Sequence, residues 1–138
     1  MDKLWNDLYC SAKERLYPRE VSPFIEAGGV AAALLTQNGS LYTGVCIDTA
    51  CSLGMCAERN AVASMLTGGE SRIVKLVCVM EDGSVGLPCG ACREALMQLD
   101  KDSPKMEILV SLNPLKITTL EALLPQWWGR ERMSASEG

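Results

Sequence analysis

Three cysteines and one glutamate, in the segments CAER (56–59) and PCGAC (88–92), could together carry out metal-dependent chemistry. Both segments lie where a loop is expected to enter a helix. The N-terminus of a helix favours a thiolate, the metal-binding form of cysteine, because its free N–H groups and dipole are positive. The spacing of Cys89 and Cys92 lets both sulfurs face one point, and Cys56 supplies a third ligand. Three protein ligands leave one tetrahedral position open, as in catalytic zinc sites, so the sequence predicts one zinc ion per chain.

Glu58 and Arg59 follow Cys56 and Ala57 in the first of these segments. On a helix start, Glu58 places its carboxylate near the metal but too close in sequence to Cys56 to be an easy ligand. It fits a proton shuttle, because zinc lowers the pKa of water toward neutrality and a nearby carboxylate can accept the proton. Three thiolates leave excess negative charge at the metal. Arg59 is the natural cation to balance that charge, with Arg93 as a second choice.

Other interpretations of these residues remain open. A C-x-x-C motif alone is also typical of structural zinc half-sites and of redox pairs, although a redox pair more usually follows the first strand of a thioredoxin-like unit. A fourth cysteine, from among Cys46, Cys51 and Cys78, could close the site into a structural one. Cys78 lies in an apolar segment where a buried thiol is expected, and Cys10 and Cys51 are interpreted as packing residues. Glu58 alone could be a solvated helix residue.

Composition argues against several classes of function. Histidine is absent, which rules out Cys/His zinc sites, Ser-His triads and a histidine general base. The net charge is -4, the pI is about 4.8 and the basic residues are scattered, so no nucleic-acid partner is expected. No segment approaches the roughly 18 consecutive apolar residues of a membrane span, so no membrane partner is expected. Acidic residues near the N-terminus do not fit a signal peptide, and we expect a cytoplasmic protein whose seven cysteines form no disulfide framework.

Apolar spacing and turn residues predict alternating helices and strands. The Asn-Gly pair at 38–39, between two apolar runs, predicts a β-hairpin because both residues tolerate positive φ. Pro125 ends the last predicted helix, for which Thr118 or Thr119 is the expected N-cap. Alternation in the second half predicts βαβ crossovers, and therefore an α/β fold with a partly parallel sheet. The expected elements are helices over 2–16, 57–66, 92–99 and 118–124 and strands over 29–36, 41–47, 73–80 and 106–112, followed by a polar tail at 130–138 that we expect to be frayed.

Taken together, CAER at 56–59 and PCGACR at 88–93 resemble the signature of the cytidine deaminase superfamily, a His- or Cys-x-Glu followed by Pro-Cys-x-x-Cys. A cysteine in first place indicates the three-cysteine branch, which contains free-nucleoside cytidine deaminases and blasticidin S deaminases. The resemblance extends from about Val30 to Trp128. It implies one cytidine deaminase-like domain over residues 1–138, built as a three-layer α/β/α fold around a mixed five-stranded sheet.

The resemblance also implies an activity, the hydrolytic release of ammonia from a free cytidine-like nucleoside. Water activated by zinc would attack the ring carbon that bears the amino group, and Glu58 would pass protons to the ring nitrogen and to the leaving amine. The partner is then a small-molecule substrate, and no organic cofactor is required. Two alternatives are kept: a deaminase of blasticidin S or another amino-heterocycle with non-standard sugar contacts, and a non-catalytic zinc-binding module on the same fold.

Substrate contacts are implied at Ala57, Leu87, Cys46 and Asp48. The backbone carbonyl of Leu87 would accept a hydrogen bond from the substrate's amino group. Cys46 and Asp48 occupy a stretch where the family usually carries an Asn and a Glu that hold the ribose hydroxyls, and Gly28 stands where an aromatic residue is usual. Losing an amide or an aromatic contact costs on the order of 1–3 kcal/mol in recognition. We therefore expect cytidine to be a weaker substrate than for an ordinary cytidine deaminase.

Trp127 and Trp128 precede the polar tail, where ordinary packing demands no large aromatic residue. One interpretation is that both cap the local core. The resemblance implies another, because three-cysteine deaminases generally form homotetramers in which an aromatic residue and a glycine after Leu-Leu-Pro reach a neighbour's active site. Trp128 and Gly129 fall at that position. We therefore expect a homotetramer, with a dimer as the alternative, and Trp128 as a contributor to another chain's pocket.

Overall fold

The computed structural model describes residues 2–137, which form one mixed sheet with helices packed on both faces. Its strands are β1 (Arg19–Ser22), β2 (Ile25–Thr36), β3 (Leu41–Thr49), β4 (Ile73–Val79), β5 (Val85–Gly86), β6 (Glu107–Leu112) and β7 (Leu115–Thr119). Its helices are α1 (Asp2–Lys13), α2 (Ala57–Thr67), α3 (Gly90–Met97), α4 (Leu120–Leu123) and α5 (Arg130–Glu137), with a short 3-10 turn, η1 (Ser103–Lys105). The strand order is β1-β2-β4-β6-β7, with β3 paired to β2 and β5 to β4. Only the β4–β6 pair among these strands is parallel.

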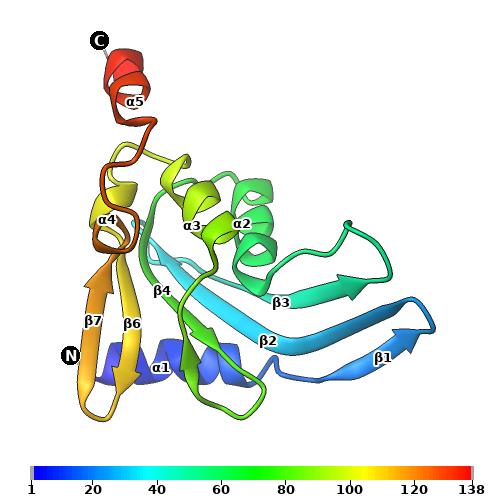
Figure 1. Cartoon of the computed structure of the whole chain (residues 1–138). Coiled ribbons are helices and arrows are strands. Elements are labelled where there is room, and N and C mark those ends of the chain that lie inside the picture. The colour runs from blue at the N-terminus through cyan, green and yellow to red at the C-terminus, as the bar shows by residue number, and fades with distance from the viewer. Residues whose placement is uncertain (1, 138) are drawn as a thin grey trace.

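Both faces of the sheet are buried, which explains why β2 and β4 are apolar over most of their length. Ala32 and Leu34 of β2 pack in a cluster with residues of α2, α3 and α4. Ala31 and Ala33 point to the opposite face, because successive strand residues alternate, and pack against α1, whose Trp5 is buried there. Figure 1 shows α1 against one face of the sheet and α2, α3 and α4 over the other. The predicted three-layer α/β/α fold is confirmed.

The sheet contains seven strands, so the expected number of five is wrong. The strands β1, β5 and β7 are the ones that the sequence pattern did not indicate. β1 is mostly exposed, β5 has two residues, and β7 includes Thr118 and Thr119, which we expected at the start of a helix. Short strands near a sheet edge are held by hydrogen bonds to a neighbouring strand and need no apolar pattern of their own.

The helices α2 and α3 begin at the two segments that carry the cysteines. Cys56 is the N-cap residue of α2 and Cys89 is the N-cap residue of α3. Neither cysteine side chain caps its helix, so both sulfurs are free to face elsewhere. The prediction that both segments lie at loop-to-helix junctions is confirmed.

Two helices at the end of the chain differ from expectation. α4 is shorter than predicted, and of the two candidate N-caps it uses Thr119, whose Oγ1 accepts a hydrogen bond from the N–H of Ala122 at 3.3 Å. Residues 130–137, expected to be frayed, form α5, in which Met133 N–H donates to the carbonyl of Gly129. Good helix formers such as Arg, Glu and Met, with no proline among them, account for this helix. Among residues 2–137, no helix is long and apolar enough to cross a membrane.

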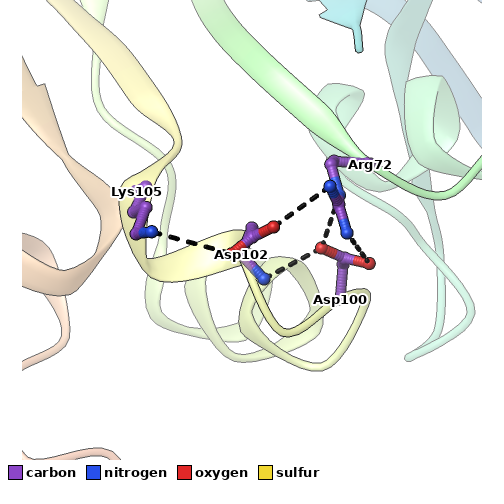
Figure 2. A network of polar contacts seen from close by, with 4 residues as sticks. All are labelled: Arg72, Asp100, Asp102 and Lys105. Carbon is purple, nitrogen blue, oxygen red and sulfur yellow. Dashed lines mark hydrogen bonds and ion pairs between the residues drawn. The ribbon is translucent and has the colours of Figure 1, made fainter. Parts of the chain in front are cut away.

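A network of charged side chains fixes the end of α3 to the start of β4 (Figure 2). Arg72 Nε lies 2.9 Å from Asp100 Oδ2, and Arg72 Nη1 lies 3.1 Å from Asp102 Oδ2. Lys105 Nζ is 3.9 Å from the other oxygen of Asp102. Because α3 contains Cys92 and begins directly after Cys89, a network that ties the turn after α3 to β4 helps to position both cysteines.

Candidate active site

Three cysteine sulfurs from two helix starts converge on one point. The Sγ atoms of Cys56, Cys89 and Cys92 all lie within 4.8 Å of one another, and those of Cys56 and Cys89 are 3.5 Å apart. Cys92 is fully buried, Cys56 is half-buried and Cys89 is exposed, so one side of the cluster opens outward. The fold thus brings together the three residues that the sequence indicated as metal ligands.

The chemistry of this donor set fits a zinc ion. Thiolates are soft ligands that suit zinc, and three protein ligands leave an open position. Burial raises the pKa of the Cys92 thiol, and the negative charge of Glu58 raises it further. The ionised thiol is therefore unfavourable there by itself. A divalent cation among the sulfurs removes this penalty, because a coordinating thiol is deprotonated outright.

Glu58 lies in the first turn of α2 and is only 4% exposed. Burial raises the pKa of its carboxyl, while its backbone N–H, the Cys78 thiol and the charge of Arg59 oppose that rise. A carboxyl with a raised pKa beside a cavity holds a proton more readily than an exposed carboxyl and is a candidate for proton transfer. Its carboxylate is not part of the three-sulfur cluster. This placement suits a proton carrier better than a metal ligand.

Arg59 brings a positive charge to the sulfurs. Its Nη2 atom lies 3.8 Å from Cys56 Sγ, and its guanidinium also hydrogen-bonds to Cys92. These contacts raise the pKa of Arg59 because they stabilise its charged form. The Nε atom of Arg59 is buried without a hydrogen-bond partner in the described part of the chain. Arg59 therefore contacts two of the three clustered cysteines with its guanidinium group.

Arg93, the second choice for that role, has a different contact set. Its Nε donates to the carbonyl of Pro88 at 2.7 Å, and its Nη1 donates to the carbonyl of Leu123 at 3.1 Å. Arg93 therefore ties the loop before α3 to α4.

A cavity of about 430 Å³ lies beside the sulfurs of Cys56 and Cys89 and the carboxyl of Glu58. Its volume lies within the range of small-molecule sites. Among its walls are four residues for which the sequence indicated substrate contacts: Ala57, Leu87, Cys46 and Asp48. The wall also contains Val30, Met55, Cys78 and Met80, which make it largely apolar.

Cys46 and Gly28 are the two positions at which the sequence departs from the family resemblance, and of the two only Cys46 lines this cavity. The sulfur of Cys46 accepts a hydrogen bond from the backbone N–H of Val30, with an N···S distance of 3.2 Å. Gly28 has φ of +84°, and a Cβ atom on it would lie 2.1 Å from the carbonyl oxygen of Tyr17. No side chain fits there, so the chain could not carry an aromatic residue at this position without rebuilding the backbone.

Trp128 lies outside this cavity. It is 67% exposed and, together with Trp127 and Gly129, lines a separate groove near α5. The indole N–H groups of Trp127 and Trp128 both donate to Glu94 Oε2, at 2.9 and 3.1 Å. Trp127 also packs against the core cluster, as local packing requires. Within one chain, Trp128 contributes nothing to the wall of the candidate active site.

Met55 and Met80 are wall residues that the sequence does not indicate, and Cys78, which the sequence offers as a packing residue or a fourth structural ligand, is a further one. Cys78 is buried, as expected, yet it borders the cavity and hydrogen-bonds to the Glu58 carboxyl. Its thiol has a raised pKa because of burial and stays protonated. The alternation of β4 is the signal that could have found it, because Cys78 and Leu76 share the face that α2 covers.

Comparisons with known proteins agree with this geometry. The cytidine deaminase of Mycobacterium tuberculosis (strain ATCC 25618 / H37Rv) is 34% identical over 101 residues, which are 72% of each chain. That of Sporosarcina psychrophila is 31% identical over 106 residues, 76% of this chain and 78% of that protein. The crystal structure of cytidine deaminase from M. tuberculosis matches with a TM-score of 0.75 at 30% identity, covering 91% of this chain and 97% of that chain. No family model matches the sequence. On the identity and coverage of these relatives, the chain belongs to the cytidine deaminase family.

Proposed function

We propose that this protein is a zinc-dependent hydrolase that removes the amino group of a free cytidine-like nucleoside and releases ammonia. One observation carries the proposal. Three sulfurs lie within 4.8 Å of one another, and Cys56 and Cys89, which carry two of them, line a cavity whose wall also includes the buried Glu58. The relatives named cytidine deaminase support the same reaction.

Cys56, Cys89 and Cys92 would hold one zinc ion per chain. When bound, zinc supplies a Lewis acid that lowers the pKa of water and so provides a nucleophile at neutral pH. Arg59 offsets part of the negative charge of the three thiolates through its contacts with Cys56 and Cys92. The exposed side of the cluster, at Cys89, leaves room for ligand entry.

Glu58 would move the protons of the reaction. Its carboxylate accepts a proton from the attacking water and delivers it to the ring nitrogen beside the reacting carbon. It then transfers the proton of the new hydroxyl to the amino group, which leaves as ammonia while the ring carbonyl forms. We assign further substrate contacts to Ala57 and to the backbone carbonyl of Leu87, both in the cavity wall.

The burial of Glu58 speaks against a non-catalytic zinc-binding module. A purely structural zinc site has no use for a carboxyl that is 4% exposed, faces a cavity and is not one of the clustered ligands. Burying such a group is costly, and groups with perturbed pKa values gather at functional sites.

A second candidate, a deaminase of blasticidin S or another amino-heterocycle, is favoured by Cys46. Its sulfur already accepts a hydrogen bond from Val30, and a thiol cannot offer the paired donor and acceptor of an amide. Together with Asp48, it gives the sugar end of a nucleoside an unusual pair of contacts. The two candidates share the same chemistry at Glu58 and differ in the ring or in the group attached to it.

The test is a panel assayed for ammonia release, containing cytidine, 2′-deoxycytidine, cytosine and blasticidin S, together with elemental analysis of protein purified without chelators. We expect one zinc per chain and ammonia from at least one substrate. Protein without zinc, or a zinc-loaded protein inactive on the whole panel, contradicts the proposal. A value of kcat/KM for cytidine near roughly 10⁶ M⁻¹s⁻¹, inside the usual enzyme range, would show that the Cys46 and Gly28 departures do not matter.

We further propose that the chain assembles as a homotetramer in which Trp128 reaches the cavity of another copy. The exposure of Trp128 and its absence from the cavity of its own chain support this assignment.

A further inference from the structure

We infer that Met80 is a specificity-determining residue, whose side chain rests on Gly86 and limits the bulk that a bound ring can carry on its edge. This inference rests on the proposed function, because it takes the cavity beside Glu58 to be the site that holds the ring.

The backbone of Met80 is fixed, whereas its side chain borders open space. Its N–H donates to the carbonyl of Ser84 at 2.8 Å, and its carbonyl accepts from the N–H of Gly83 at 2.9 Å. These two bonds belong to the turn between β4 and β5. The side chain is 39% exposed and forms part of the cavity wall. The flexible thioether can therefore change conformation, while the backbone that carries it stays in place.

Gly86 lies under the distal half of the Met80 side chain. A Cβ atom placed on Gly86 would lie 2.6 Å from Sδ of Met80, 3.2 Å from its Cγ and 3.9 Å from its Cε, so the distal half of the side chain covers the glycine. Met80 lines the cavity and Gly86 does not, and the side chain that a methyl group on Gly86 would meet is that of Met80. The backbone of Gly86 is outside the positive-φ region, so alanine can adopt it. A methyl group there would act on Met80, pushing its thioether toward the cavity.

Met80 lies within reach of the ring. It follows Cys78 by two residues, directly after β4 ends at Val79, and both residues line the cavity. Cys78 hydrogen-bonds to the Glu58 carboxyl, beside which the reacting carbon would lie. A ring held with that carbon at Glu58 therefore occupies the cavity whose wall includes Met80.

The test measures binding, which needs no chemistry. Uridine and 5-methyluridine, which differ by one methyl on the ring edge, are titrated into the zinc-loaded wild type, Met80→Ala, Gly86→Ala and the double variant by calorimetry. One added methyl in an apolar pocket is worth roughly tenfold or more in affinity. We expect Met80→Ala to raise the affinity for 5-methyluridine relative to uridine about tenfold. Gly86→Ala should shift the ratio in the opposite direction.

The double variant should behave like Met80→Ala, because the alanine at position 86 acts only through the thioether. Met80→Leu, which keeps the bulk, is the matched control and should retain the wild-type ratio. Equal ratios in all variants would overturn the inference, as would a Gly86→Ala effect that persists without Met80. Because binding of uridine requires no deamination, an inactive enzyme would refute the proposed function without deciding this result.

Discussion

The Nη2 atom of Arg59 lies 3.8 Å from Sγ of Cys56, so a cation from the first turn of α2 reaches the sulfur that precedes the helix. The positive charge stabilises the thiolate that a metal requires. We expect Arg59→Gln to weaken zinc binding or lower kcat by roughly 10–100-fold, as is usual for groups that contact metal ligands. Chelator competition and steady-state kinetics measure the two effects. Arg59→Lys keeps the positive charge, so its zinc affinity and kcat should fall less. Equal losses in the two variants would show that the positive charge does not cause the effect.

Replacing Glu58 tests its proposed role directly. Glu58→Gln keeps the size of the side chain but cannot transfer protons, so we expect kcat to fall by roughly 10²–10⁴-fold or more. Zinc content and the melting temperature should stay at wild-type values, because the carboxylate is not one of the clustered ligands. Substantial remaining activity would refute the proton-carrier role, and loss of zinc would point to a ligand instead.

Glu70 predicts how stability depends on pH. Its carboxylate accepts hydrogen bonds from Thr36 and from Tyr42, and these lower its pKa, with further help from Ser40 and Asn38. A depressed pKa in the folded state means that the stabilisation is fully present above the unfolded value of about 4.3 and is lost as the pH falls through the folded pKa. The free energy of unfolding of the wild type, measured by urea denaturation, should therefore exceed that of Glu70→Gln by a constant margin from pH 7 to 6. That margin should shrink below about pH 4.3; a margin that is the same at pH 7 and pH 3 would contradict the assignment.

The helices and the strand that position the site can be predicted from local sequence patterns, whereas the residues that line the cavity cannot. The period of apolar residues predicts α2, α3 and the strand β4, and the cysteine segments predict where the two helices begin. The neighbours of Glu58 depend on the register between distant strands, in which Ala32 pairs with Cys78. No local pattern carries that register. For this reason the sequence alone predicts an ordinary core thiol at Cys78 and gives no indication that Met80 lines the cavity.

The charged network at the end of α3 should contribute measurably to stability. Arg72 forms two ion pairs with partly buried partners, Asp100 and Asp102. Because Asp100 and Asp102 are only 18% and 33% exposed, Arg72→Ala should lower the free energy of unfolding by more than the loss of an exposed surface pair does. The exposed pair of Lys3 and Asp7 on α1 is a matched control, and Lys3→Ala should cost roughly 0.5 kcal/mol or less. Similar costs for both variants in urea denaturation would contradict this ranking.

Trp128 should form part of the substrate cavity of another chain. Its indole is held by Glu94 yet is 67% exposed, and it is separate from the cavity of its own chain. Trp128→Ala should therefore weaken substrate binding without removing zinc. Trp127→Ala should instead destabilise the fold, because Trp127 packs against the core. Light scattering on dilute protein should find a tetramer, and a stable, fully active monomer would rule out the shared site.

Mixing two inactive proteins distinguishes a contact between chains from a contact within one chain. Glu58→Gln subunits lack the proton carrier but keep Trp128, whereas Trp128→Ala subunits keep Glu58 but lack the indole. If Trp128 completes a neighbour's cavity, mixed tetramers contain sites that combine Glu58 of one subunit with Trp128 of another. Unfolding and refolding the two variants together should then give more activity than the sum of the two refolded separately. Activity equal to that sum, in tetramers shown by mass spectrometry to contain both variants, would place the role of Trp128 within its own chain.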